Sequence, residues 1–167
     1  MVTQNDQFLL YLSNCSSAQL TALQNGPRRY PFPFLGMVRK VVSDRLALAG
    51  EHLRVGDQLV FALQFRSSIS RHYYAMYHAA RAIVFAETPG DDHQRHGDLP
   101  RHIPTGMANS AQREAELTAA RLLRNEADYD PYPATSPDWE PDARQLSVTA
   151  ADFVQACEYF ALANGHI

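Results

Sequence analysis

Cationic side chains gather in the middle of the chain, where the stretch from Val60 to Ala86 contains no aspartate or glutamate. The bases of this stretch are Arg66, Arg71, His72, His78 and Arg81. Arg71, Tyr74, His78 and Arg81 recur at i, i+3, i+7 and i+10, which places them on one face of a helix. Such a face could bind phosphate. The alternative is that Arg71 and His78 pair with carboxylates of a neighbouring helix and only fix its packing.

A second polar cluster lies further along the chain, at the end of another predicted helix. Its members are Arg121, Arg124, Asn125, Asp128 and Tyr129. Arg124 and Asp128 are spaced as i and i+4 and can form an ion pair within the helix. An exposed pair of this kind contributes only about 0.3–0.5 kcal/mol, unless the arginine is turned inward and shared with another chain.

A histidine-containing segment separates the two clusters. His93, His96 and His102 occur there together with Asp91 and Asp92. Metal ligands are usually held on regular elements or in tight knuckles, and ordering them on a loop rich in proline and glycine costs entropy. We therefore expect no metal site, and no other cofactor.

Other catalytic motifs are absent from the sequence. It contains no HExxH, Gly-x-Ser-x-Gly, P-loop or Gly-x-Gly-x-x-Gly motif. Its two cysteines, Cys15 and Cys157, form no CxxC or zinc spacing, and Cys157 lies in an apolar helical pattern. We expect both to be small core residues of a protein in a reducing compartment, and neither to be a nucleophile.

Helices must position these clusters, because apolar residues recur at helical spacing and no segment alternates as a strand does. The expected helices run from Leu35 to the interruption at Val55-Gly56-Asp57, from between Leu59 and Ser68 to about Ala86, from Asn109 or Ser110 to about Ala127, and from Thr149 to just before Gly165. The second should be central. Short connections place consecutive helices antiparallel. The sequence thus predicts an all-α fold, an up-and-down helical bundle of about four main helices.

Residues 1–34 are predicted to form an N-terminal helical extension in front of the bundle domain, residues 35–167. Gln7–Leu12 and Ser17–Leu23 could each form a short helix, and the glycine and prolines that follow break the chain. We expect the extension to pack on the bundle through Phe32 and Phe34.

Two connections are distinguished by their composition. Thr88–Thr105 mixes proline and glycine with charged residues, which predicts a long, exposed and mobile segment. Residues 128–142 contain four prolines and five acidic residues without a basic one, which predicts an irregular, solvated acidic loop.

The 167 residues carry 15 basic and 18 acidic side chains, a formal net charge of −3. This balance excludes a protein that coats nucleic acid by bulk electrostatics, so any nucleic-acid contact must be local. No apolar stretch approaches the ~20 residues of a membrane helix, and no targeting segment is visible. We expect one compact domain in the cytoplasm, without a membrane partner.

Two segments resemble the signature of the HEPN superfamily. The first is Ser68-Ile69-Ser70-Arg71-His72-Tyr73-Tyr74-Ala75-Met76-Tyr77-His78-Ala79-Ala80, which is similar to the central helix of small prokaryotic members. The second is Arg124-Asn125-Glu126-Ala127-Asp128-Tyr129-Asp130, which resembles a later helix ending in Arg-Asn-x-Ala-Asp-Tyr. Between them, His96-Gly97 loosely matches a histidine-containing turn. The resemblance covers roughly residues 36–163 and does not include residues 1–34.

The resemblance implies an all-α bundle that commonly dimerises and that cuts or binds RNA in toxin-antitoxin, phage-defence and CRISPR-linked systems, often beside a minimal nucleotidyltransferase. Active members carry an arginine, a polar residue and then a histidine four to six positions after the arginine, and two protomers combine them into a metal-independent site. Arg124 and Asn125 match the first two positions, but Tyr129 stands where the histidine would be. A phenol with a pKa of about 10 cannot replace imidazole as a base at neutral pH.

We therefore predict an RNA- or partner-binding homodimer of a toxin-antitoxin or phage-defence system, with a degenerate ribonuclease motif, in which Arg71, His78, Arg121 and Arg124 surround one shared groove. The predicted binding residues are Arg71, Tyr74, Arg81, Arg121, Asn125, Asp128 and Tyr129. The alternative is a metal-independent endoribonuclease in which Arg124 stabilises the scissile phosphate and His78, leaning across the helix interface, or His102 acts as the base. A third hypothesis makes the protein a partner of a nucleotidyltransferase that modifies Tyr129 or Tyr132.

Overall fold

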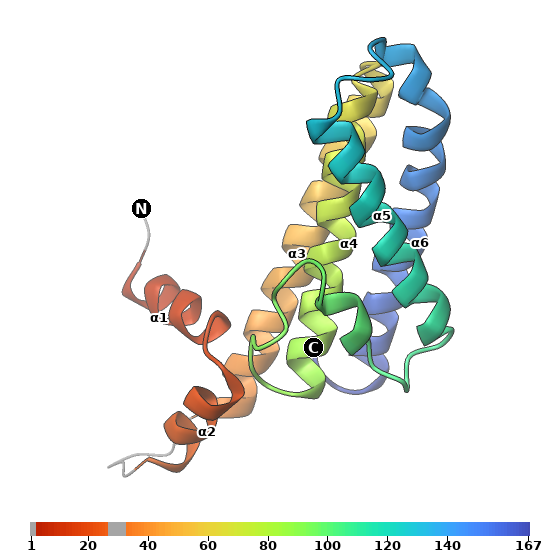
Figure 1. Cartoon of the computed structure of the whole chain (residues 1–167). Coiled ribbons are helices and arrows are strands. Elements are labelled where there is room, and N and C mark those ends of the chain that lie inside the picture. The colour runs from red at the N-terminus through yellow and green to blue at the C-terminus, as the bar shows by residue number, and fades with distance from the viewer. Residues whose placement is uncertain (1–2, 27–32) are drawn as a thin grey trace.

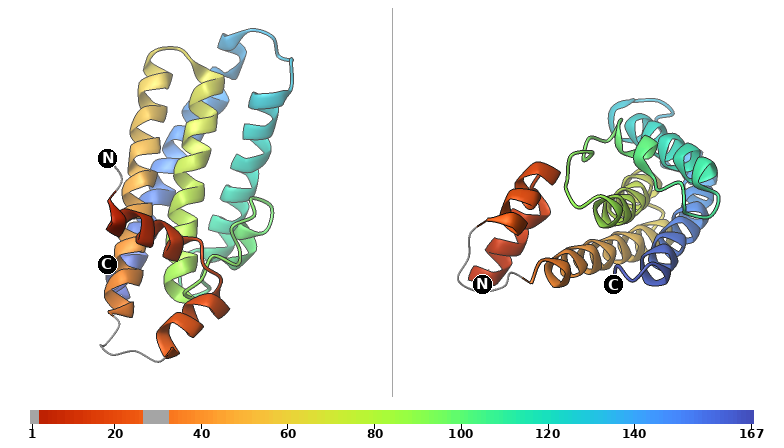
Figure 2. Two further views of the ribbon diagram at one scale, coloured as in Figure 1. Left: turned by 90° about the vertical axis from the view of Figure 1, so that its left-hand side faces the viewer. Right: turned by 90° about the horizontal axis from the view of Figure 1, so that it is seen from below.

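Four long helices dominate the computed structural model, which describes residues 3–26 and 33–167. They are α3 (Phe34–Phe61), α4 (Phe65–Glu87), α5 (Ser110–Tyr129) and α6 (Glu140–Ala163). They run up and down beside one another (Figures 1 and 2), and the described residues contain no strand. The predicted all-α helical bundle is confirmed.

α4 is the central helix, because it packs against α3, α5 and α6. Its long apolar side chains Ile69, Met76 and Ile83 recur every seventh residue and are fully buried. Burying a side chain of this size stabilises the fold by about 1.5–3 kcal/mol. Alanines fill much of the remaining circumference, so the neighbouring helices approach α4 closely.

α3 does not end at Val55-Gly56-Asp57, and the predicted interruption there is wrong. The helix continues to Phe61 because Gly56 serves the packing against α4. A Cβ atom at Gly56 would lie 2.7 Å from Nε2 of the buried His72. That same nitrogen lies 3.0 Å from Oδ1 of Asp57. The glycine provides space for a buried histidine, at a helix-propensity cost of about 1 kcal/mol.

α6 begins at Glu140, so the predicted start at Thr149 is also wrong. The short 3-10 helix η2 (Ser136–Trp139) leads into α6, and the buried indole of Trp139 donates to the carbonyl of Pro133 at 2.9 Å. This anchor fixes the chain directly before α6. Since α5 also extends to Tyr129, the irregular acidic loop is shorter than predicted.

The connection between α4 and α5 is not the wholly exposed segment that its composition predicts. It contains the short 3-10 helix η1 (Leu99–His102), and it buries Leu99, Pro100 and Ile103 against the bundle. The side chain of Asp91 is buried as well. Apolar anchors and one buried charge therefore hold this connection in place.

The N-terminal extension forms α1 (Gln4–Ser13) and α2 (Ser17–Asn25), each opened by a capping box. Both helices lie beside α3 and the α4–α5 connection (Figures 1 and 2), and Leu12, Cys15 and Leu20 are buried there. Phe34 packs against the core, as predicted. The other predicted anchor, Phe32, lies outside the described residues.

Candidate functional site

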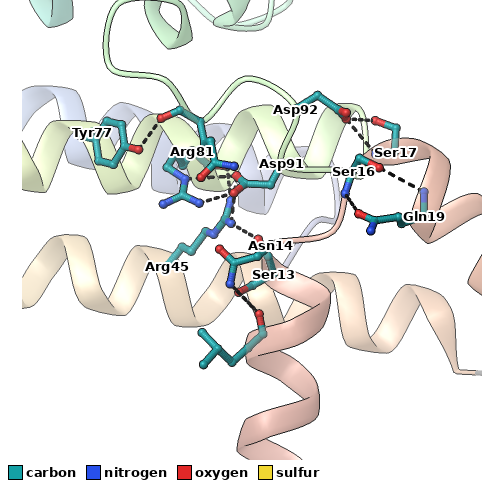
Figure 3. A network of polar contacts seen from close by, with 12 residues as sticks. Ser13, Asn14, Ser16, Ser17, Gln19, Arg45, Tyr77, Arg81, Asp91 and Asp92 are labelled. Carbon is teal, nitrogen blue, oxygen red and sulfur yellow. Dashed lines mark hydrogen bonds and ion pairs between the residues drawn. The ribbon is translucent and has the colours of Figure 1, made fainter.

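One end of the cationic face of α4 is closed by a buried carboxylate (Figure 3). Arg81 forms an ion pair with Asp91, and Arg45 of α3 approaches the same carboxylate at 3.1 Å. Arg45 also donates to the carbonyl of Ser13 and, at 3.1 Å, to that of Arg81. Burial, and then the charge of Arg81, lower the pKa of Arg45 to about 10. We call Arg45, Arg81 and Asp91 the closed network.

The closed network fastens the N-terminal extension to the bundle. The backbone N–H of Asp91 donates to the carbonyl of Cys15 at 2.8 Å, and the backbone N–H of Ser17 donates to Asp92 at 2.8 Å (Figure 3). Arg81 was predicted to bind a ligand, but its guanidinium group forms an ion pair with the buried Asp91. Its position is accounted for by the fold.

The second cluster is built around Arg124 of α5. Its Nη2 donates to the hydroxyl of Tyr74 at 2.7 Å and its Nη1 donates to Asn125 Oδ1 at 3.1 Å. Nε lies 2.8 Å from Oδ2 of Asp128, so the predicted i, i+4 ion pair is present, although the N–H is not aligned for a hydrogen bond. The contact with Tyr74 brings α4 and α5 together at this arginine.

Aromatic rings surround the Arg124 guanidinium group. Its Cζ lies 5.3 Å from the ring centre of Tyr74, 5.8 Å from that of Tyr73 and 5.7 Å from that of Tyr129. These are cation–π distances. Tyr129 is 72% exposed, so one ring of this frame faces solvent.

His96 reaches the same place from the α4–α5 connection. Its Nδ1 lies 2.5 Å from the hydroxyl oxygen of Tyr73, and its ring stacks on Tyr77 with centroids 4.2 Å apart. Burial, and then the positive charges of Arg124, Arg81 and Arg121, lower the pKa of His96. The sequence offered only the loose His96-Gly97 match as a signal, because the contact with Tyr73 depends on the path of a loop.

Arg121 lies beside His96 without an acidic partner. No described carboxylate pairs with it, its Nε is buried without a hydrogen bond, and a Cβ at Gly97 would lie 4.0 Å from its Nη1. Arg121, Arg124, Tyr74, Tyr129 and His96 form what we call the open cluster. Of its two guanidinium groups, only that of Arg124 has a carboxylate partner among the described residues, Asp128, so the cluster carries excess positive charge beside exposed aromatic surface.

His78 and Arg71 lie on the predicted face of α4, but neither pairs with a carboxylate among the described residues. The ring of His78 stacks on His52 of α3, with centroids 5.2 Å apart and planes 3° apart. Burial, and then the charges of His52 and Arg81, lower the pKa of His78 to about 4. Arg71 is exposed, one helical turn before Tyr74.

His78 was predicted to lean toward Arg124, but the structure shows no contact between these two side chains. Tyr74 instead contacts both, with its hydroxyl on Arg124 and its ring 6.4 Å from that of His78. The histidine that joins the surroundings of Arg124 is His96. Both predicted clusters therefore meet, but through Tyr74 rather than through His78.

The remaining bases of α4 have structural roles. His72 is fully buried between Ser68 and Asp57, and burial lowers its pKa. Arg66 donates to the carbonyl of Ala127 at 2.7 Å and to that of Asp130, which satisfies the C-terminal end of α5. These residues do not contribute to the open cluster.

The histidine-containing segment divides into three parts. Asp91 belongs to the closed network, Asp92 contacts the N-terminal extension, and His96 belongs to the open cluster. His93 and His102 meet each other beside Asp98, a residue that the sequence analysis did not single out.

Both cysteines are buried and unpaired, as predicted for core residues. Burial raises the pKa of the Cys157 thiol, which disfavours a reactive thiolate. No described helix combines the length and hydropathy needed to cross a membrane.

Comparisons with known proteins add no relative to this description. No protein-family model, no curated protein and no solved structure matches the chain.

Proposed function

We propose that the protein is an RNA-binding homodimer of toxin-antitoxin or defence type, with a degenerate ribonuclease motif, and that the open cluster contacts the RNA. One observation carries this proposal. Arg121 has no carboxylate partner in residues 3–26 and 33–167, and it lies one turn before Arg124, which is framed by Tyr74 and the exposed Tyr129.

The chemistry of the open cluster matches single-stranded RNA. Arginine side chains bind phosphate oxygens, and aromatic faces stack on unpaired bases, with about 1–3 kcal/mol per stacked base. Arg71 extends the same face by one turn of α4, and Asn125 offers an amide next to Arg124. Since the chain as a whole is acidic, binding must be confined to such a local surface.

Cleavage is the alternative activity that the HEPN resemblance implies. It requires a base near the phosphate that Arg124 binds, and His78 does not contact Arg124. His96 lies 2.5 Å from the hydroxyl of Tyr73, over whose ring Arg124 is placed. If the protein cleaves RNA, His96 is therefore the histidine to test.

The homodimer is proposed from the same resemblance. Support comes from a groove of about 410 Å³ between α3 and α6, which is bordered by Leu46, Leu162 and Ile167. Tyr159 and Leu162 are exposed along it. A second copy could bury these apolar side chains, and light scattering of the purified chain measures whether it does.

The binding proposal is tested with a fluorescently labelled single-stranded oligoribonucleotide and the Arg121→Ala/Arg124→Ala variant. The matched control is Arg54→Ala/Arg144→Ala, which removes the same charge from two exposed intrahelical ion pairs. In the first variant we expect the affinity to fall roughly tenfold or more. The slope of log K against log salt concentration should become less negative by about 1.4, because two phosphate contacts are lost.

An equal loss in both variants would contradict the proposal, because binding would then follow net charge alone. The same mixtures, analysed on a denaturing gel without added metal, report cleavage. If the unmodified chain cleaves the RNA and His96→Ala does not, the protein is an endoribonuclease and the proposal of a non-cleaving binding protein is wrong.

A further inference from the structure

We propose that His93, Asp98 and His102 form a binding site for a divalent transition metal of the Zn²⁺ class. One ligand atom from each side chain lies within 4.8 Å of the other two. Among the described residues, this is the one group of three or more such side chains with that geometry. The site lies in the connection between α4 and α5.

The separations of the two imidazole nitrogens from the Asp98 carboxylate match those of ligands around a metal. Oδ2 of Asp98 lies 3.3 Å from Nδ1 of His93 and 3.4 Å from Nε2 of His102. A charge-assisted N–H···O hydrogen bond would be shorter, about 2.7–2.9 Å. Two ligands that bind Zn²⁺ at 2.0–2.2 Å in a tetrahedron are about 3.3–3.5 Å apart. Both distances therefore fit ligands that share an ion, and in its absence His93 hydrogen-bonds to Asp98.

The backbone holds two of the three ligands on one turn. Asp98 and His102 are spaced as i and i+4 around η1, and the amides of Asp98 and Leu99 both donate to the carbonyl of Arg95 at 2.9 Å. The burial of Leu99 anchors this turn against the bundle. The entropic cost that argued against a metal site in an irregular loop is therefore reduced, because the fold already orders the turn.

The third ligand lies across from this turn. The rings of His93 and His102 stack with centroids 3.4 Å apart, so both imidazoles lie on the same side of Asp98. Each ligand side chain is about one third exposed, at 35%, 38% and 36% for His93, Asp98 and His102. An ion can therefore enter the site from solvent.

The ligand types specify the class of metal. Two imidazole nitrogens and one carboxylate oxygen suit Zn²⁺ and its neighbours, whereas Ca²⁺ and Mg²⁺ prefer oxygen ligands alone. Three protein ligands leave a fourth position for water. Residues 93 and 102 bracket His96, so a bound metal would close the loop that presents His96 to the open cluster. The site depends on this loop geometry and not on RNA binding.

The test is a titration of the full-length, untagged chain with Co²⁺, a spectroscopic substitute for Zn²⁺, followed by displacement with Zn²⁺. We expect one Co²⁺ per chain, with the visible absorption of a tetrahedral site. His93→Ala/His102→Ala should lower the affinity roughly 100-fold or more, because loss of supporting contacts alone costs 10–100-fold. Asp98→Asn should lower it roughly tenfold.

The control is His166→Ala, which removes a histidine that contacts Glu87 and Phe160 instead. It should bind Co²⁺ as the unmodified chain does. Circular dichroism verifies that each variant is folded, and Asp98→Asn provides the answer should the double variant unfold. No stoichiometric binding by the unmodified chain, or unchanged binding by Asp98→Asn, would overturn the proposal.

Discussion

The closed network and the open cluster each contain two arginines, and they differ in how the charge of those arginines is neutralised. In the closed network, Arg45 and Arg81 share Asp91, whose side chain is 3% exposed, and Arg45 also donates to the backbone carbonyls of Arg81 and Ser13. In the open cluster, Arg124 pairs with the partly exposed Asp128, and Arg121 has no acidic partner in the described residues.

The difference shows that residue type and spacing do not reveal whether the fold supplies an arginine with a buried counter-charge. Arg71, Tyr74 and Arg81 share one helical face, but the α4–α5 connection delivers a buried carboxylate to Arg81 and an imidazole to the vicinity of Arg124. A buried guanidinium with its counter-charge in place stabilises a tertiary contact, whereas an unpaired, accessible one can take a phosphate.

The largest effect is expected from Asp91→Asn, which leaves two buried guanidinium groups without their shared negative charge. Removing one partner of a buried ion pair costs about 3–5 kcal/mol. We expect the free energy of unfolding, measured with urea by circular dichroism, to fall by that amount.

The control for Asp91→Asn is Asp44→Asn, which removes an exposed carboxylate from its i, i+4 pair with Lys40. It should change the free energy of unfolding by at most about 0.5 kcal/mol. Equal losses at the two positions would show that Asp91 stabilises the fold no more than an exposed carboxylate does. The contrast between the closed network and the open cluster would then be wrong.

The next effect concerns pH and His78, which lies between the two regions. Its pKa in the folded chain is about 4, against an ordinary value of about 6.5 in the unfolded chain. The unfolded chain binds the proton more tightly, so this group lowers stability as the pH falls from about 6.5 to about 4 and has no such effect above that range.

His78→Phe keeps a ring against His52 and removes the titration. The unfolding free energy of this variant should therefore fall less than that of the unmodified chain between pH 7 and pH 4.5. Some slope remains, because burial lowers the pKa of His52 and His72 in the same direction. An unchanged slope would mean that neither burial nor the charges of His52 and Arg81 lower the pKa of His78 in the folded chain.

The fold was largely predictable, because apolar periodicity is a local property of the sequence. Two of the errors have tertiary causes. Gly56 interrupts the sequence pattern of α3 but not the helix, since its missing side chain makes room for His72. The start of α6 depends on Trp139, whose indole donates to the carbonyl of Pro133 and lies under the guanidinium group of Arg66 on α4.

The candidate site was predictable only where its contacts are local. The ion pair between Arg124 and Asp128 follows from i, i+4 spacing, and it forms. The partners Asp91 for Arg81 and His96 for Tyr73 are set by the path of a connection, which spacing does not encode. For the same reason, the sequence spacing did not predict that His93 lies beside Asp98 and His102.

The smallest effect is expected from Tyr74→Phe, which removes the hydroxyl that accepts a hydrogen bond from Arg124. Arg124 is partly exposed and keeps Asp128 and Asn125, so the loss should be about 1 kcal/mol of unfolding free energy.

Tyr129→Phe is the matched control, because no described group hydrogen-bonds to the exposed Tyr129 hydroxyl. If Tyr74→Phe instead costs as much as Asp91→Asn, then Arg124 is as deeply committed to the fold as Arg81. Its guanidinium group would then not be free to take a phosphate.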